Sequence, residues 1–151
     1  MILNLPTTVD ALPYYVAPKN IALFERHKIF TAAELRGRYE ILLENYNNVN
    51  SIEAYTMLSI VRKQILPSVM EYTRFLSETI SAKKAAIASI DTSCEEDLLI
   101  QLQDIYVRAY HKTKKLSDAM EESGKEDKQQ EAYYFKEVVL PLMEDLRVEC
   151  D

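Results

Sequence analysis

Residues 51–90 read SIEAYTMLSIVRKQILPSVMEYTRFLSETISAKKAAIASI, a run that contains no glycine and a single proline, Pro67. The apolar residues of this run recur at helical spacings, at Leu58, Ile65, Val69, Tyr72, Leu76 and Ile80. Because residues three, four or seven positions apart lie on one side of an α-helix, the spacing predicts a long amphipathic helix with one buried face. Pro67 removes a backbone hydrogen bond inside that helix, and we expect it to bend the axis.

The same spacing returns in two later segments. Apolar residues at helical intervals are Leu102, Ile105, Ala109, Leu116 and Met120 in residues 93–122, then Phe135, Val139, Leu142 and Leu146 in residues 128–150. Gly124 suits the left-handed position after a helix end, so a short polar turn at this point predicts that these two helices are antiparallel neighbours. The three segments together predict an all-α fold, an up-and-down helical bundle with long antiparallel helices.

Four helix starts are indicated by one device, a capping side chain followed three residues later by Glu or Gln. The pairs are Thr31 with Glu34, Asn50 with Glu53, Ser93 with Glu96, and Asp127 with Gln130. In each pair the first side chain accepts a hydrogen bond from a free backbone N–H, and the second side chain reaches back to the cap. These signals predict helices near residues 31–48, 51–90, 93–122 and 128–150.

The first 18 residues contain three of the five prolines. Each proline fixes its own φ and favours an extended conformation in the residue before it, so we expect an extended, Pro-rich lead-in over residues 1–18 that lies along a surface. Pro18 suits the first turn of a helix, and a short amphipathic helix is expected to end near His27-Lys28. The predicted organisation is therefore a lead-in at 1–18 and a helical bundle domain at 19–151.

Composition excludes several classes of function. The formal net charge is -6 and the pI is near 5.0, which would repel a phosphate backbone, so nucleic acid is not an expected partner. No apolar run is long enough to span a membrane, and the N-terminus has no signal-peptide pattern. Cys94 and Cys150 are isolated thiols without metal or disulfide spacing, which is typical of a reducing compartment. We expect a cytoplasmic protein without membrane or nucleic-acid partners.

Residue patterns that carry chemistry are not found in this sequence. The two histidines, His27 and His111, are not part of an E-x-x-H pair, and a zinc site would need them to converge with Cys94 and Cys150 from four distant positions. The only glycines are Gly37 and Gly124, so no glycine-rich phosphate loop is present. We therefore predict no catalytic, cofactor-binding or metal-binding residue in this chain.

Ten tyrosines and no tryptophan form an unusual aromatic balance. Two interpretations remain open. The tyrosines, among them Tyr106 and Tyr110, are either core-edge residues whose hydroxyls reach water, which is the commoner case, or parts of an aromatic recognition surface. The adjacent Tyr133 and Tyr134 cannot both face the helix seam, so at least one of them is a candidate for an interface.

Several short sequence motifs resemble those of a known family. The motifs are Asn4-Leu5-Pro6-Thr7-Thr8-Val9-Asp10-Ala11-Leu12-Pro13, Thr31-Ala32-Ala33-Glu34-Leu35, Arg38-Tyr39-Glu40-Ile41-Leu42-Leu43-Glu44-Asn45-Tyr46, Ser51-Ile52-Glu53-Ala54, Ile65-Leu66-Pro67 and Val138-Val139-Leu140-Pro141-Leu142-Met143-Glu144-Asp145-Leu146-Arg147. In this order they resemble the C-terminal helical domain of a type III glutamine synthetase. The match weakens after about Ala85, between Ser89 and Gln130.

The resemblance implies a parent enzyme that joins ammonia to glutamate with ATP and magnesium, in a large ring-shaped oligomer. It implies that the catalytic residues and both cofactors belong to sequence upstream, so this fragment alone is not expected to be catalytic. Its implied role is structural, in assembly, or regulatory, with the parent's catalytic domain and neighbouring subunits as partners. The alternative from a different class is a free-standing helical module that binds a protein or a ligand.

Overall fold

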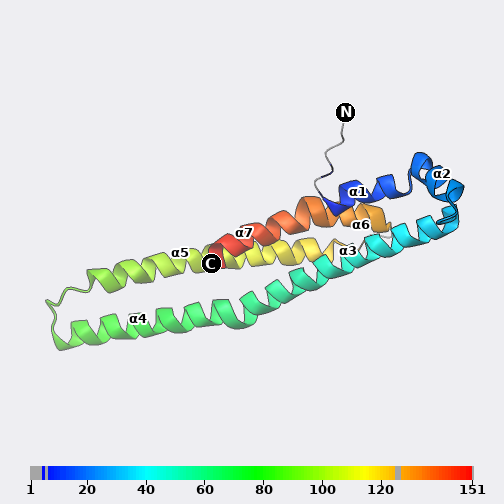
Figure 1. Cartoon of the computed structure of the whole chain (residues 1–151). Helices are drawn as coiled ribbons and strands as arrows, with labels where there is room; N and C mark the ends of the chain where they lie inside the picture. The colour runs from blue at the N-terminus through cyan, green and yellow to red at the C-terminus, as the bar shows by residue number, and fades with distance from the viewer. Residues whose placement is uncertain (1–4, 6, 125–126, 151) are drawn as a thin grey trace. The chain divides into compact units, whose positions relative to one another are not determined.

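The computed structural model describes residue 5, residues 7–124 and residues 127–150 (Figure 1). The helices of this part of the chain are α1 (Thr8–Tyr15), α2 (Pro18–Arg26), α3 (Ala32–Ile60), η1 (Val61–Ile65), α4 (Leu66–Ala86), α5 (Ser93–Glu121), α6 (Lys128–Tyr134), η2 (Phe135–Val139) and α7 (Leu140–Cys150). The segments η1 and η2 are π-helical turns. The described residues contain no strand, which confirms the predicted all-α fold.

The chain forms two compact units. Unit 1 comprises the described residues of Met1–Glu53 together with Ala119–Pro141, and unit 2 comprises those of Ala54–Asp118 and Leu142–Asp151. The long helices α3 and α5 each contribute residues to both units. The predicted division between a lead-in and a bundle at residue 18 stays a prediction.

A single helical run replaces the two helices expected at residues 31–48 and 51–90. α3, η1 and α4 follow one another from Ala32 to Ala86 without a break (Figure 1). The predicted cap at Asn50 is wrong, because Asn50 is buried in α3 and its Nδ2 donates to the Tyr46 carbonyl oxygen at 2.7 Å. Because this amide is bonded to a carbonyl one turn earlier in the same helix, Asn50 does not cap the N-terminus of a new helix.

The other predicted helix starts are close to those observed. Thr31 and Glu34 form the expected reciprocal pair, with Thr31 N–H donating to Glu34 Oε2 at 2.8 Å and Glu34 N–H to Thr31 Oγ1 at 3.3 Å. Asp127 caps α6 by accepting from Gln129 N–H at 2.8 Å. α5 begins at Ser93 as predicted, but the side chain that accepts from Ser93 N–H is that of Asp91, at 3.0 Å.

Part of the segment expected to be extended is helical. Residues 1–4 and 6 lie outside the described residues, but Thr8–Tyr15 form α1, and Pro13 lies inside it. Two contributions offset the loss of one backbone bond at Pro13. Thr7 caps the helix by accepting from Asp10 N–H at 3.4 Å, and Val9 and Leu12 are buried in the core of unit 1. α1 therefore packs against α3 and α6, in keeping with the expectation that the lead-in lies along a surface.

The π-helical turns accompany the two prolines of the long helices. The tripeptides Ile65-Leu66-Pro67 and Val139-Leu140-Pro141 each begin with the last residue of a π turn. After η1, Leu66 N–H bonds to the Val61 carbonyl five residues earlier. A proline lacks the N–H of a regular helix and its ring crowds the carbonyl four residues back, so a widened turn just before it gives that carbonyl room.

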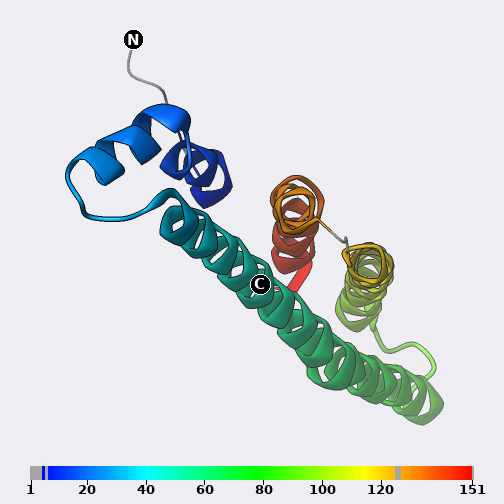
Figure 2. The same ribbon diagram turned by 90° about the vertical axis from the view of Figure 1, so that its right-hand side faces the viewer.

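Unit 1 has a small core that α1, α3 and α6 share. Its buried members are Val9, Leu12, Leu43 and Ala132, and Tyr39, Tyr46 and Tyr133 pack against them. Figure 2 shows α1 and α2 beside the N-terminal end of α3. α2 begins with Pro18 as expected and has no buried residue, while the Phe24 ring lies 6.1 Å from Tyr15 and 5.9 Å from Phe30.

Unit 2 contains an antiparallel pair of helices, α4 and α5, and the end of α7. Lys83 pairs with Glu95, and Tyr106 donates to the Met70 sulfur at 3.4 Å, so residue numbers rise along α5 as they fall along α4. Buried apolar residues of this unit include Leu58, Val61, Leu66, Leu76, Leu116 and Leu146. Tyr72, which the periodicity placed in the seam, is 46% exposed.

Left-handed backbone occurs elsewhere than predicted. Gly124 does not have a positive φ, so the expected left-handed cap after α5 is wrong; that helix ends at Glu121, and Ser123 N–H returns to the Met120 carbonyl at 3.4 Å. Among the described residues Lys28 has the positive φ, 53°, just after α2. α5 and α7 are nevertheless antiparallel, since Arg108 pairs with Glu149 and Lys112 with Asp145.

Candidate interaction surface

The residues most suited to chemistry lie apart from one another. His27 is exposed at the C-terminal cap of α2, and His111 is exposed on α5 beside Tyr110. Cys94 is exposed in the first turn of α5, and Cys150 is half-buried in the last turn of α7. Among the described residues, no three His, Cys, Asp or Glu side chains come close enough to hold a metal ion. The expectation that this chain carries no catalytic, cofactor or metal site stays a prediction.

The tyrosines divide between the core edge and the surface. Tyr39 and Tyr46 border the core of unit 1, where burial raises the pKa of both phenols. Of the adjacent pair, Tyr133 packs against the same core, whereas Tyr134 donates its hydroxyl to the Ala119 carbonyl at 3.1 Å. Tyr110, one of the tyrosines considered for recognition, is 51% exposed, and Tyr14 of α1 is 42% exposed.

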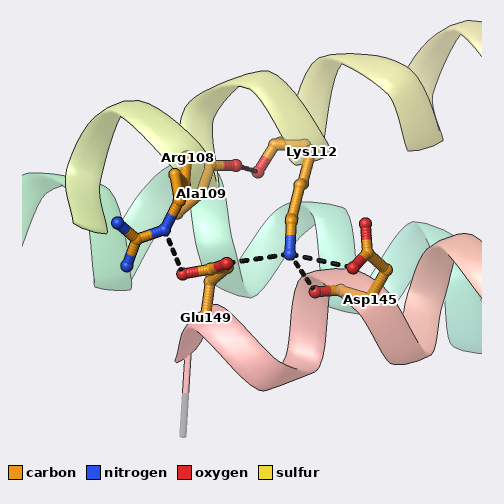
Figure 3. A network of polar contacts seen from close by, with 6 residues as sticks. Arg108, Ala109, Lys112, Asp145 and Glu149 are labelled. Carbon is orange, nitrogen blue, oxygen red and sulfur yellow. Dashed lines mark hydrogen bonds and ion pairs between the residues drawn. The ribbon is translucent and has the colours of Figure 1, made fainter. Parts of the chain in front are cut away.

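A polar network within unit 2 connects α7 to α5 (Figure 3). Lys112 Nζ donates to Glu149 Oε1 at 2.8 Å, to Asp145 Oδ1 at 2.9 Å and to the Asp145 carbonyl at 3.0 Å. Arg108 Nε donates to the second Glu149 oxygen at 2.9 Å. The bond from Lys112 holds the pKa of Glu149 below its usual range, and the bond to Glu149 raises the pKa of Lys112. The network holds α7 against α5 through two ion pairs of Glu149 and one of Asp145.

A second ion pair connects α1 to η2 within unit 1. Lys136 Nζ lies 2.6 Å from Asp10 Oδ1, and Thr7 Oγ1 donates to the other Asp10 oxygen at 2.6 Å. The hydrogen bond from Lys136 and then that from Thr7 lower the pKa of Asp10, while the bond to Asp10 raises the pKa of Lys136. Asp10 therefore holds the hydroxyl of the capping residue Thr7 and anchors α1 to η2.

Apolar side chains line the side of α3 that faces away from the core of unit 1. Core-facing residues follow the positions 39, 43, 47 and 50, and the residues two positions later are Ile41, Asn45, Val49 and Ile52. Two residues of an α-helix correspond to about 200° of rotation, so this second row lies nearly opposite the first. We call these four residues the outer stripe. Ile41 is 65% exposed, Val49 45% and Ile52 66%, and the flanking Leu42 is 42% exposed.

The outer stripe is also uncharged. Its one polar residue is Asn45, and Asn48, at its edge, is a second amide. Two nearby charges have partners elsewhere, because Glu44 pairs with Lys128 at 2.8 Å and Arg38 lies 4.4 Å from the Phe30 ring centroid. Surface helices normally carry charged residues on the side opposite the core, so an apolar and amide-bearing stripe at this place indicates a contact surface.

The size of the stripe limits what it can hold. Together with Leu42 it exposes the equivalent of about two whole apolar residues. Fully burying one such side chain stabilises by about 1.5–3 kcal/mol, so covering the stripe would contribute roughly 3–6 kcal/mol. The loss of translational and rotational freedom alone costs about 4–15 kcal/mol when two separate molecules associate. The stripe therefore suits a partner that is already held close to it, either by other contacts or by a covalent connection to the same polypeptide.

Unit 2 has a shallow groove of its own between α4 and α5. The groove has a volume of about 600 Å³ and is lined by apolar residues, including Met70 and Ile100, and by polar residues, including Arg74 and Asp104. Met70 is 56% exposed and Ile100 61% exposed. Its mixed lining would accept an amphipathic side chain or a short helix more readily than a fully apolar ligand.

In the described part of the chain, no helix is both long and apolar enough to cross a membrane.

Comparison with known proteins gives one consistent result. The family model described as the glutamine synthetase C-terminal domain matches residues 1–84. A glutamine synthetase of Butyrivibrio fibrisolvens is 35% identical over 152 residues, which cover 98% of this chain and 21% of that protein. A type-3 glutamine synthetase of Dictyostelium discoideum is 35% identical over 79 residues, covering 52% of this chain and 11% of that protein. The chain thus spans about a fifth of the length of the first relative.

Proposed function

This chain belongs to the glutamine synthetase C-terminal domain family, and we propose that it is the non-catalytic helical domain at the C-terminal end of a type III glutamine synthetase. In this proposal the domain holds parts of the enzyme together, by packing against the catalytic part of its own subunit and against neighbouring subunits. The relatives that bear the name glutamine synthetase are matched over most or about half of this chain, which supports the assignment.

The observation that carries the structural role is the number of apolar side chains left exposed on the long helices. Ile41, Ile52, Phe75 and Ile100 are each more than half exposed. Single exposed apolar residues are ordinary on soluble proteins, but rows of them along one face of a helix mark contact surfaces. A domain that packs against a larger body of protein would bury them.

The chemistry of the parent belongs to the rest of that protein in this proposal. ATP-dependent ligation of ammonia to glutamate, with magnesium, is assigned to sequence outside residues 1–151, because the match covers only 21% of the relative that is named glutamine synthetase. The proposal places the protein in the cytoplasm, where its exposed Cys94 thiol would stay reduced.

Deletion of the domain from the complete gene product tests the role. Removing residues 7–151 takes away α1 together with its partners, so that Val9 and Leu12 are not left exposed on a remnant. Light scattering after size exclusion should show loss of the native oligomer, and glutamine formation should fall with it. Glu71→Gln, a change at one exposed polar side chain of α4, is the control for handling and should leave both unchanged. An oligomer of unchanged mass and activity after the deletion would exclude a role in assembly.

A free-standing binding module is the second candidate, and the α4–α5 groove is the observation that favours it. The two candidates predict products of different size. An antibody raised against residues 1–151 should detect a band several times larger than 17.5 kDa in the producing cell if the chain is a synthetase domain. A band at 17.5 kDa would favour the module, and a search for ligands of the groove would follow.

A further inference from the structure

We infer that the outer stripe of α3 is the surface by which this domain seats on the remainder of its own glutamine synthetase, against a face that is apolar and uncharged. The inference rests on the proposed function and adds to it one helix face and one occupant. The alternatives, pairing with a second copy of this chain and a stripe that nothing covers, are outcomes of the test below.

The position of the stripe favours it over other exposed apolar residues of the chain. Ile41, Val49 and Ile52 lie on one side of a helix whose opposite side is fixed in the core of unit 1 through Leu43, so the stripe is presented outward on a rigid element. It also lies in the part of the chain, residues 1–84, that matches the family model. A face within the segment shared by the family suits a contact with the rest of such an enzyme.

The chemistry of the stripe specifies what covers it. Because no position of the stripe is charged, the opposing face needs no buried ion pair, and a charge placed there would lose its hydration without gaining a partner. The amides of Asn45 and Asn48 are both exposed on this side of the helix and would lose water on docking. The surface that covers the stripe must therefore offer hydrogen-bond donors or acceptors to one or both amides. These bonds would fix the position of that surface along α3.

The small area of the stripe favours the same protein over a separate molecule. Stable interfaces between separate proteins bury about 800 Å² on each partner, far more than three or four half-exposed aliphatic side chains provide. A covalently connected partner is present at a high effective concentration, so a small apolar patch is enough to hold it. About four-fifths of the first relative lies outside the matched segment and would supply such a partner.

The test uses the complete gene product with two stripe substitutions, Ile41→Asp and Ile52→Asp, and Ile87→Asp as the matched control. Ile87 is 58% exposed, similar to the stripe residues, but lies at the end of α4 in unit 2. Both stripe positions are exposed, so the domain itself should fold, and its far-ultraviolet circular dichroism checks this. Amide hydrogen exchange over residues 41–52 should become about tenfold faster in the stripe variant and stay unchanged in the control.

Disulfide cross-linking identifies the occupant. In a background with Cys94→Ser and Cys150→Ser, the substitutions Val49→Cys and Ile52→Cys are made separately and oxidised. A cross-link between two copies of this domain would overturn the inference in favour of self-pairing. Protection of each introduced thiol from maleimide in the complete protein, without such a cross-link, supports seating on the remainder of the enzyme.

The outcomes separate this inference from the proposed function. If deletion of residues 7–151 disrupts the oligomer but the Ile41→Asp, Ile52→Asp variant exchanges and assembles like the unmodified protein, the domain acts in assembly through another surface and the inference fails. If the deletion variant assembles normally while the stripe of the complete protein is protected from maleimide, the proposed assembly role fails, but the inference that the stripe contacts the remainder of the enzyme stands. Rapid maleimide labelling of both introduced thiols in the complete protein would show that nothing covers the stripe, and would overturn the inference.

Discussion

Asn47 is a buried polar residue that connects α3 to α6 within unit 1. It is 5% exposed, and its Nδ2 donates to the Lys128 carbonyl at 3.0 Å and to Glu131 Oε2 at 2.9 Å. Its Oδ1 has no protein partner among the described residues. The side chain therefore gains two bonds but leaves one buried acceptor unsatisfied, which reduces its net contribution.

We expect Asn47→Ala to lower the free energy of unfolding by about 1 kcal/mol, because two hydrogen bonds are lost while an unsatisfied oxygen is also removed. Urea denaturation followed by circular dichroism measures this. Asn48→Ala is the matched control, since Asn48 is an exposed neighbour on the same helix, and its effect should stay within about 0.5 kcal/mol. Equal midpoints for the two variants would show that the contact with α6 contributes nothing.

The pKa of Glu149 predicts a dependence of stability on acid. Lys112, then Arg108, lower that pKa in the folded chain, so the carboxylate contributes stability above its unfolded pKa, about 4.3, and this contribution is lost as the pH falls through the folded pKa. Glu149→Gln should therefore lower the melting temperature at pH 7 and have less effect near pH 3. Thermal denaturation at both pH values measures this, with Glu53→Gln, at an exposed position of α3, as control. A loss of the same size at pH 3 and pH 7 would contradict it.

At the scale of elements, α1 depends on its cap because it is only eight residues long and contains Pro13. Thr7→Ala removes the hydroxyl that accepts from Asp10 N–H, and a lost cap of this kind costs about 1 kcal/mol. Amide exchange in residues 9–15 should accelerate about fivefold, as that free energy implies, while Thr8→Ala, at an exposed position next to the cap, should change it little. Unchanged exchange in Thr7→Ala would mean that contacts with the core alone hold α1.

The π turn η1 carries one residue more than a regular helix needs, and this predicts the effect of a deletion. Removing Lys63, which is exposed in η1, should convert the turn to α-helix while Leu66 and Leu76 keep their buried positions. We expect the shortened chain to fold with unchanged helix content and with a free energy of unfolding within about 1 kcal/mol of the original.

Deletion of Arg74, also exposed, is the control for that experiment. Here the chain must expose either Leu66 or Leu76, because no extra residue lies between them to absorb the change. Burial of one leucine is worth about 1.5–3 kcal/mol, so the urea midpoint should fall clearly. If deletion of Lys63 destabilised the chain as much as deletion of Arg74, the π turn would not be acting as an extra residue.

The sequence predicted most helix starts because capping is local. Thr31 and Asp127 cap as their neighbours in the chain indicated, but Asn50 does not, since its amide is bonded to the Tyr46 carbonyl within the same helix. Spacing by 3.6 residues also misses a π turn. It favoured Ile65 for the core, whereas the structure buries Leu66 to 7% exposure, one position later. Backbone bonds across five residues leave no signal in the apolar pattern before Pro67.

For the whole molecule, charge and exposed apolar surface together predict the behaviour of the 151-residue chain on its own. The net charge of -6 at pH 7 falls to zero near the pI of about 5.0. At that pH, electrostatic repulsion no longer keeps the outer stripes of different copies of the chain apart. Dynamic light scattering should show association on titration from pH 7 to about pH 5. The variant Ile41→Ser, Ile52→Ser keeps the net charge and should associate less. Equal association of both would mean that other surfaces cause it.

The candidate surface could be predicted only in part from the sequence. α3 has apolar residues on two sides, at Leu43 and at Ile41, and spacing alone does not say which side is covered. The choice depends on Val9, Leu12 and Ala132, which reach Leu43 from segments distant in the sequence. The polar network of Lys112 with Asp145 and Glu149 depends in the same way on how α7 lies against α5.

The widened turns before Pro67 and Pro141 also bear on how genes of this family can change in length. Loss of one whole codon keeps the reading frame wherever it occurs. Within η1 or η2 it removes a residue that the helix does not need, so the buried leucines downstream keep their positions. A codon lost elsewhere in α4 turns the rest of the helix away from its neighbours. Single-codon differences among related genes should therefore gather at these two places.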